Sequence, residues 1–211
     1  MSEPAPRATS GAAFWDERYR AAEAAFGLAP TPLVEAWADR FAPGARVVDV
    51  GAGEGRNALF LATRGVRTAA LDFATEGLKK AAERAAADGL TLDVVEQDVR
   101  DWQPEAGAWD GVVCVFTHLL PDERAGFYQT VIRALRPGGL LVAEWFTPEQ
   151  LGYRSGGPSV PDRLVAPEEL EAAFGGAGRV LLGESGERVL DDGPFLQGPA
   201  ATVRFVFERG T

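Results

Sequence analysis

Three glycines at alternate positions follow a short apolar run and precede an amphipathic segment. They are Gly51, Gly53 and Gly55, and the apolar run is 46–50. Roughly 20 residues further on, Asp72 ends a second apolar run. Glycine lets a backbone turn sharply toward a ligand that a Cβ would exclude, and a carboxylate can accept hydrogen bonds from ribose hydroxyls. The pattern therefore predicts a nucleotide-type binding site at the ends of two strands.

The spacing of the glycines indicates which nucleotide would bind. A dinucleotide fingerprint reads G-x-G-x-x-G/A, and its third small residue allows the helix to pack closely on the strand. Here the pattern is G-x-G-x-G, and the long cation Arg56 occupies the position that should be small. Asp49, just before the first glycine, would repel a pyrophosphate and suit an amino group. An amino acid joined to adenosine fits better than a dinucleotide, which indicates S-adenosylmethionine.

These residues must be positioned by a strand, a helix and a second strand, and the same alternation continues along the chain. Near-continuous apolar runs at 46–50 and 110–116 are typical of central parallel strands covered on both faces. Near the C-terminus, alternating apolar residues around a turn at 191–194 predict an antiparallel edge. We expect strands at 46–50, 67–71, 91–96, 110–116, 140–146, 179–190 and 201–208, and helices at 13–25, 32–41, 55–64, 75–88, 122–135 and 167–175.

Five motifs in the middle of the chain occur in the order and spacing of a known family. They are residues 49–55, Asp72, 97–99, 110–116 and 135–140. Through these motifs, residues 45–146 resemble the class I S-adenosylmethionine-dependent methyltransferases. The resemblance implies an α/β fold: a doubly wound, Rossmann-like sheet of seven mostly parallel strands whose last strand is antiparallel. A narrower resemblance, to the tellurite-resistance methyltransferases, rests on residues 14–19 and 53–57.

Ligands of doubly wound sheets bind beyond the carboxyl ends of the strands, and the resemblance selects the same places. By resemblance, Asp72 holds the ribose diol, Phe73 flanks adenine and Asp98 meets the adenine amino group. The resemblance also assigns the glycine turn to the methionine portion of S-adenosylmethionine, with S-adenosylhomocysteine as the product. The predicted cofactor-binding residues are Asp49, Gly51, Ala52, Gly53, Gly55, Arg56, Asn57, Asp72, Phe73, Asp98, Val99, Val115 and Phe116.

The single histidine, His118, follows the strand expected at 110–116, where the methyl acceptor should lie. Histidine titrates near neutrality, so His118 could act as a general base on a hydroxyl or amine, or it could orient the loop by hydrogen bonding. Cys114 lies inside the apolar strand, where burial raises the pKa of a thiol and suppresses its nucleophilicity. A covalent mechanism of the pyrimidine C5 type therefore has no nucleophile.

Four polar residues have two interpretations each. Arg56 could reach a carboxylate of cofactor or substrate, or it could form a salt bridge. The Gly- and Pro-containing loop after residue 146 carries Tyr153, Arg154 and Arg163, and such loops often determine substrate selectivity. Its arginines could attract a small anion, or the loop could simply be solvated.

Aromatic residues near the N-terminus also have two interpretations. Trp15, Arg18 and Tyr19 share one face of an expected helix, so they could close over the cofactor as a lid or pack into the core.

The domain organisation follows from the whole chain. We expect a flexible tail at residues 1–12, without the apolar segment of a signal peptide, followed by one domain. Its parts would be a helical lid at 13–42, a cofactor-binding core at 45–146, and a substrate loop with the antiparallel edge at 147–211.

Composition limits the partners. A chain of 211 residues with 46% apolar and 25% charged residues is expected to form one globular domain. The net charge of −10 disfavours binding to nucleic acid or to anionic membranes, and no apolar run approaches the ~20 residues of a membrane span. One cysteine fits a reducing compartment. These features predict a cytoplasmic monomer or homodimer that takes a small-molecule substrate and carries no metal.

The predicted reaction is methyl transfer to a small-molecule acceptor by direct in-line displacement, with sulfur, selenium, tellurium, oxygen and nitrogen all open as acceptor atoms. One alternative is an NAD(P)-dependent oxidoreductase. The glycine spacing disfavours it, and none of the three tyrosines is followed four residues later by lysine. The other alternative, a non-catalytic module that binds S-adenosylmethionine, stays open.

Overall fold

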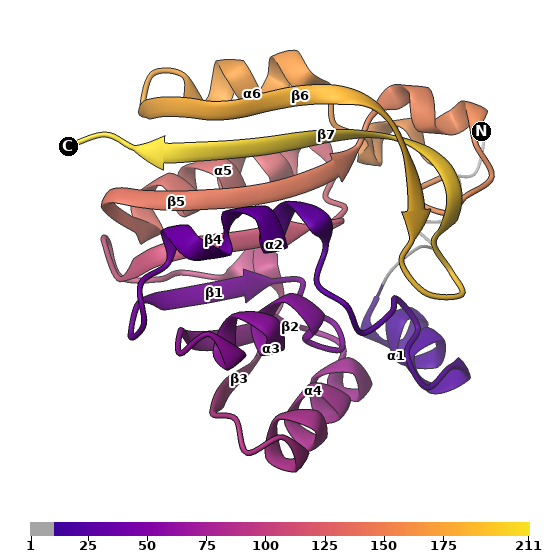
Figure 1. The fold of residues 1–211 in the computed structure, drawn as a ribbon. Helices are drawn as coiled ribbons and strands as arrows, with labels where there is room; N and C mark the ends of the chain where they lie inside the picture. Colours follow the sequence, from indigo (N-terminus) through magenta and orange to yellow (C-terminus); the bar gives the residue numbers. More distant parts are fainter. Residues whose placement is uncertain (1–10) are drawn as a thin grey trace.

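The computed structural model describes residues 11–211 (Figure 1). A seven-stranded sheet runs through it in the order β3-β2-β1-β4-β5-β7-β6. The strands are β1 Arg46–Val50, β2 Arg67–Asp72, β3 Leu92–Glu96, β4 Trp109–Val115, β5 Leu135–Phe146, β6 Gly178–Asp191 and β7 Gln197–Arg209. Strand β7 pairs antiparallel with β5 and β6, whereas β1 to β5 pair in parallel. The predicted α/β class, with a doubly wound, mostly parallel sheet and a reversed last strand, is confirmed.

Helices cover both faces of the sheet. Alternate residues of the central strands face opposite sides, so one face packs against α5 and α6 and the other against α2 and α3. In β1, for example, Val48 belongs to the first of these cores and Val47 to the second. The helices are α1 Ala12–Ala21, α2 Pro32–Trp37, α3 Arg56–Thr63, α4 Thr75–Ala87, α5 Pro121–Ala134 and α6 Pro167–Phe174, with short 3₁₀ turns at Ala38–Arg40, Val99–Asp101, Pro148–Gly152 and Pro161–Arg163.

The first helix ends at Ala21, four residues before the predicted end at 25. The ammonium group of Lys80 on α4 donates to the carbonyl oxygens of Tyr19 and Ala22, which draws the chain away from the helical path. The backbone N–H of Ala25 then donates to Glu54 at 2.7 Å. The segment after α1 is thereby fastened over the glycine turn. The predicted tail, residues 1–12, lies outside the described residues except for Gly11 and Ala12, and Ala12 already begins α1.

Strand β5 also starts earlier than predicted, at Leu135 instead of residue 140. Leu135 pairs with Trp109, and the register then shifts so that Leu140 pairs with Gly111. The residues between them, with Gly138 at a φ of 75°, form an irregular bulge within the strand instead of a loop before it.

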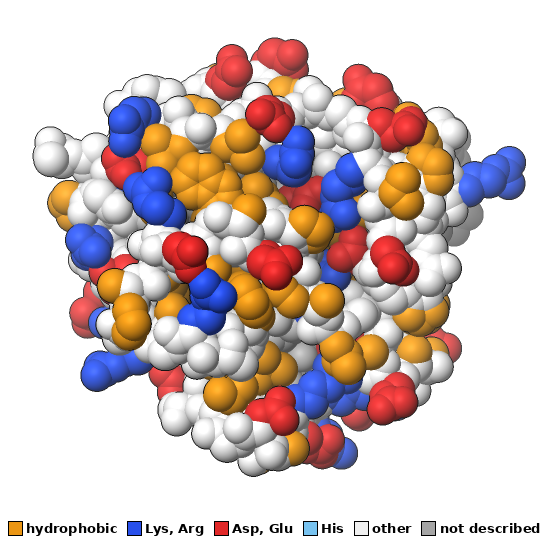
Figure 2. All heavy atoms as spheres, in the orientation of Figure 1, with side chains coloured by type: hydrophobic (Ala, Val, Ile, Leu, Met, Phe, Trp, Pro, Cys, Tyr) orange, Lys and Arg blue, Asp and Glu red, His pale blue; other side chains and the backbone are white. Residues whose placement is uncertain are grey.

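The long hairpin β6–β7 brings the C-terminal part of the chain to the N-terminal segment. Its tip curves toward α1 in Figure 1, and the rings of Phe195 at the tip and Phe26 after α1 lie 5.9 Å apart. On the face drawn in Figure 2, acidic and basic side chains are interspersed. Within residues 11–211, no helix is both long and apolar enough to cross a membrane, and no group of three or more His, Cys, Asp or Glu side chains could hold a metal.

Candidate functional site

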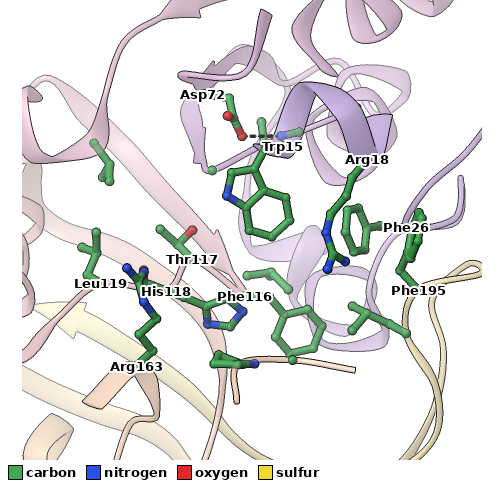
Figure 3. A pocket seen from close by; sticks show the side chains of 18 of the residues that line it. Trp15, Arg18, Phe26, Asp72, Phe116, Thr117, His118, Leu119, Arg163 and Phe195 are labelled. Atoms are coloured by element: carbon green, nitrogen blue, oxygen red, sulfur yellow. Dashed lines mark hydrogen bonds between the residues drawn. The ribbon is translucent and has the colours of Figure 1, made fainter. Parts of the chain in front are cut away.

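A cavity of about 330 Å³ lies at the carboxyl ends of β1, β2 and β4, where the strand-end rule places a ligand. Its size falls in the range of small-molecule sites. Figure 3 shows side chains from α1, from the loop after β4 and from the hairpin tip surrounding it. The glycine turn and residues 156–160 complete the walls. The cavity therefore joins the predicted cofactor site to segments from both ends of the chain.

The glycine turn is closed by its neighbours as well as by its own backbone. Gly51 and Gly53 have φ angles of 71° and 54°, which side chains rarely adopt. A Cβ on Gly51 would collide with the hydroxyl of Thr117, and a Cβ on Gly53 would collide with the hydroxyl of Tyr19. Both positions therefore require glycine, and both line the cavity.

Gly55 has a structural role in the turn and in helix packing. It does not line the cavity, and a Cβ there would lie 2.8 Å from the Cβ of Ala81 on α4. Its φ of 75° starts α3, so this glycine serves turn geometry and helix packing. The structure gives no support for direct cofactor contact by Gly55.

Asp72 fastens the end of β2 to the glycine turn. One carboxylate oxygen accepts from the backbone N–H of Gly53 and the other from that of Ala74, each at 2.8 Å. Burial raises the pKa of Asp72, and the backbone N–H groups of Ala74, Gly53 and Phe73 oppose that rise. A carboxylate has about four lone-pair sites, so both oxygens can also accept from ligand hydroxyls. Asp72 is thus held rigidly at the wall of the cavity.

Asp49 lies beneath the turn and is not among the residues that line the cavity, so its predicted contact with the cofactor stays a prediction. It is 2% exposed, and its carboxylate accepts from the backbone N–H of Ala58 at 3.2 Å. That N–H belongs to the first turn of α3, where a helix favours a negative charge. Burial nevertheless raises the pKa of Asp49 to about 7. Asp49 supports the turn from below.

The residues of α1 combine the two interpretations of lid and core. Tyr19 is buried against Gly53 and packs edge-on to Phe26, with the two rings 5.9 Å apart. Trp15 stacks on Tyr19 at 6.3 Å and, with Arg18, covers the cavity (Figure 3). Tyr19 is therefore a core residue that also lines the cavity, while Trp15 and Arg18 form part of the cover of the cavity.

The end of β4 carries the most constrained backbone in this region. Phe116 has a φ of 57°, the one positive φ of a non-glycine residue within residues 11–211. Its ring stacks on Phe146 at 4.5 Å, and Thr117 donates to the carbonyl of Val50 at 3.0 Å. Left-handed backbone at a bulky residue is strained and concentrates at functional sites.

His118 follows directly and faces the cavity. Burial and the nearby guanidinium of Arg163 lower the pKa of His118 to about 3. Its Nδ1 is buried without a hydrogen-bond partner, and Arg163 donates to its backbone carbonyl at 2.7 Å. A neutral imidazole with so low a pKa is a weak base, so the geometry disfavours the predicted general-base role and leaves a hydrogen-bond acceptor.

Arg56 forms a salt bridge, the second of its two interpretations. It pairs with Asp192 at the hairpin tip and donates to the carbonyl of Phe26 at 2.8 Å. Asp192 also contacts Arg188 at 3.3 Å, and Arg188 bonds Glu144 on β5 at 2.6 Å. This buried ion network joins the glycine turn to the C-terminal hairpin.

Asp98 lies at the rim of the cavity and shares its charge with Arg100. The guanidinium Nε donates to Asp98 at 2.9 Å and lowers the pKa of this carboxyl. Arg100 also reaches Glu123 at 3.2 Å. An adenine amino group would therefore compete with Arg100 for Asp98.

Most of the predicted site residues line one cavity, while two from the loop after β5 do not. Tyr153 hydrogen-bonds Glu187 at 2.6 Å outside it, and Arg154 is exposed. Sequence patterns offered no signal for Phe26 and Phe195, which come from distant segments, whereas Thr117 and Leu119 follow the end of β4, where the strand-end rule could have found them. The predicted residues that line the cavity are Trp15, Arg18, Tyr19, Gly51, Ala52, Gly53, Arg56, Asn57, Asp72, Phe73, Asp98, Val99, Val115, Phe116 and His118, and those missed include Phe26, Thr117, Leu119, Phe146, Gly157 and Phe195.

Residues 47–139 match the family model described as a methyltransferase domain. A curated relative, the ubiquinone biosynthesis O-methyltransferase of Methylocella silvestris, is 30% identical over 167 residues, which cover 70% of this chain and 64% of that protein. The chain thus spans less than two thirds of this relative's length.

Solved structures show the same fold at lower identity. An S-adenosylmethionine-dependent methyltransferase from Methanosarcina mazei has a TM-score of 0.69 at 16% identity, covering 87% of this chain and 99% of its own. The [4+2]-cyclase SpnF has a TM-score of 0.67 at 17% identity, covering 85% and 80%. By the family match over residues 47–139 and by its fold, the chain is similar to the S-adenosylmethionine-dependent methyltransferases. The narrower resemblance to the tellurite-resistance branch stays a prediction, because structures this distant show the fold alone.

Proposed function

We propose that this protein transfers the methyl group of S-adenosylmethionine to a small-molecule acceptor in the cavity at the strand ends. The observation that carries the proposal is that one cavity joins the glycine turn and Asp72 to an aromatic chamber made by Phe116, Phe146 and Phe195. A cofactor and a small acceptor can therefore meet in it. The relative named as an O-methyltransferase supports a hydroxyl oxygen as the acceptor atom.

The residues present fit the cofactor. The glycine positions leave a cradle that Cβ atoms would fill, and Asp72 offers a buried, rigid carboxylate for ribose hydroxyls. Phe73 and Asp98 line the neighbouring wall, where adenine would lie. When bound, S-adenosylmethionine supplies a methyl group that is already activated on a sulfonium.

The chain's own contribution is alignment and exclusion of water. Holding two reactants in line can account for roughly 7–11 kcal/mol of a barrier. Trp15, Tyr19 and Phe26 cover the glycine turn, and Phe116 and Phe146 enclose the space beyond β4. Because the pKa of His118 is about 3, this site would orient the acceptor instead of deprotonating it.

The setting we propose is cytoplasmic, as a monomer or homodimer without nucleic-acid or membrane partners. The net charge of −10 and the single, buried Cys114 support it. The rival oxidoreductase loses its phosphate-binding candidate, since Arg56 is paired with Asp192. A turnover assay is what separates the proposed enzyme from a non-catalytic module that binds S-adenosylmethionine, because one fold hosts several activities.

The test is calorimetric titration of the protein with S-adenosylmethionine, S-adenosylhomocysteine and NADH. We expect the adenosyl ligands to bind and NADH not to bind. Asp72→Asn should weaken S-adenosylhomocysteine binding by about 100-fold, since hydrogen bonds to a charged group contribute about 1.5–3 kcal/mol each. The matched control is Asp88→Asn, an exposed aspartate after α4 that should leave the affinity unchanged. Binding of NADH alone would overturn the proposal, and adenosyl binding without methylation of any small acceptor would leave the non-catalytic module.

A further inference from the structure

Five of the eight charged side chains that line the cavity form ion pairs. On the cofactor side, Glu54 pairs with Lys80 at 3.0 Å, and Asp98 and Glu123 both pair with Arg100. Arg56 pairs with Asp192. A cavity wall without a counter-charge would therefore stand out.

Arg18 on α1 is such a position. Its guanidinium lies 4.6 Å from the ring centre of Phe14, 5.2 Å from that of Phe195 and 5.8 Å from that of Trp15. Across residues 11–211, Arg18 makes these ring contacts but no hydrogen bond or ion pair. In a protein of net charge −10, a half-buried cation without a carboxylate is available to an anionic ligand.

Arg18 lies in a part of the cavity away from the glycine turn. On the same helix, Tyr19 packs on Gly53, whereas Arg18 reaches Phe195 at the tip of the hairpin. In Figure 3 its guanidinium points from α1 into the cavity, on the side away from Asp72. An anion bound by Arg18 would thus lie in the aromatic chamber.

His118 gives a second requirement on the ligand. Its Nδ1 is buried without a partner, and a buried polar atom left unsatisfied costs about 1–3 kcal/mol. Neutral imidazole accepts one hydrogen bond, so a donor from the ligand would satisfy it. The rings of Phe116 and Phe146 lie beside it, with His118 5.7 Å from Phe146, and favour a flat apolar body.

We propose that the methyl acceptor is a small aromatic or apolar hydroxy acid whose carboxylate binds Arg18 and whose hydroxyl donates to Nδ1 of His118. This inference rests on the proposed function and names its substrate class. A guanidinium matches the planar, two-oxygen geometry of a carboxylate. Because the cavity that would hold the acceptor also contains the glycine turn and Asp72, where the cofactor would lie, the anion belongs to a small molecule.

The reaction then balances without a protein base. A lone pair of the hydroxyl oxygen forms the new C–O bond, the S–C bond breaks, and its electron pair stays on sulfur. The hydroxyl proton leaves to solvent. Nδ1 of His118 orients the oxygen through the hydrogen bond and does not keep the proton.

The test is calorimetry on protein saturated with S-adenosylhomocysteine, titrated with 3-hydroxybenzoate, 4-hydroxyphenylacetate and 4-hydroxycinnamate and with the matching neutral amides. We expect at least one acid to bind 10-fold or more tighter than its amide. Arg18→Gln should remove that preference, Arg18→Lys should restore part of it, and S-adenosylhomocysteine should bind all variants alike. The control Arg20→Gln, an exposed residue of the same helix, should change nothing.

Three results would overturn the inference, and they can be told apart. Equal binding of acids and amides across the panel would show that no anion site exists. If Arg18→Gln weakens S-adenosylhomocysteine but not methylthioadenosine, which lacks the carboxylate, then Arg18 holds the cofactor instead. If S-adenosylhomocysteine does not bind at all, the proposed function fails, and the acids are titrated alone: an Arg18-dependent preference would keep the anion site, and its absence would remove both.

Discussion

Backbone hydrogen bonds fix the glycine turn to the end of β2 on the cofactor side of the cavity, whereas ion pairs between distant segments fasten the hairpin that bounds the acceptor side. Asp72 binds two backbone N–H groups, at Gly53 and Ala74. On the other side, Arg56 reaches Asp192 across 136 positions, and Arg188 reaches Glu144 across 44. The cofactor side is thus a local structure of the parallel sheet, while the acceptor side exists only when the hairpin docks. The two sides should fail separately.

The largest effect should come from breaking the ion network with Arg188→Ala. Glu144 is 1% exposed and would be left buried without its cation. Removing one partner of a buried pair costs about 3–5 kcal/mol. We expect a loss of that size in the free energy of unfolding, measured in urea, while S-adenosylhomocysteine still binds the folded fraction with unchanged affinity.

The matched control for the hairpin is Arg204→Ala. This arginine pairs with Glu184 on the same hairpin, but both side chains are exposed, and such pairs contribute about 0–1 kcal/mol. Equal losses for the two variants would contradict the assignment of stability to the buried network. Loss of S-adenosylhomocysteine binding in Arg188→Ala would show that the two sides are one unit.

The second effect targets the cofactor side through Gly53→Ala. A methyl group there collides with the Tyr19 hydroxyl on a backbone at a φ of 54°. Strain and overpacking together should cost about 2–3 kcal/mol of stability. We expect S-adenosylhomocysteine affinity, measured by calorimetry, to fall by 10-fold or more. Adding Tyr19→Phe should recover part of the loss, and the absence of any recovery would argue against this contact as the cause.

The contrast also explains what the sequence could predict. Strands β1 and β4 show as apolar runs because both faces are buried, and Gly53 and Asp72 follow from the strand ends. The predicted end of α1 was wrong because Lys80, from a helix far along the chain, donates a hydrogen bond to the carbonyl of Tyr19.

The acceptor side was out of reach for the same reason. Phe195 becomes a cavity wall only because the length of the hairpin carries its tip to Phe26. Arg56 kept two interpretations because its partner, Asp192, is far away in sequence. Asp49 and Gly55 belong to the right motif, but which motif residues face the ligand depends on how α3 and α4 pack behind the turn.

A third, smaller effect concerns the charge of Asp49 beneath the glycine turn. Its pKa is about 7 in the folded protein against 3.8 for the free side chain, so the unfolded state loses its proton first as pH rises. Wild-type stability should therefore fall, relative to Asp49→Asn, between about pH 4 and pH 7 and then level off.

The full pKa shift of Asp49 corresponds to about 4 kcal/mol of stability, which wild type loses as the carboxylate ionises. Asp49→Asn avoids this loss, but it keeps only part of the advantage because the asparagine amide accepts a weaker hydrogen bond from Ala58. We expect Asp49→Asn to be more stable than wild type by about 2 kcal/mol at pH 8 and not at pH 4. Urea unfolding at the two pH values measures the difference. A gap of the same size at both would contradict the burial of a titrating carboxylate.

The smallest effect tests to which side α1 belongs. Arg20 of α1 pairs with Glu76 of α4 at 3.1 Å, but both side chains are partly in water, so Arg20→Ala should cost less than about 1 kcal/mol and nothing at high salt. Lys80→Ala should cost more, because Lys80 binds Glu54 and the carbonyls after α1. If so, α1 is anchored by the glycine turn that it covers. Arg18 on α1 is then positioned at the aromatic chamber by contacts that belong to the cofactor side. Equal losses in urea would instead make α1 a loosely attached cover.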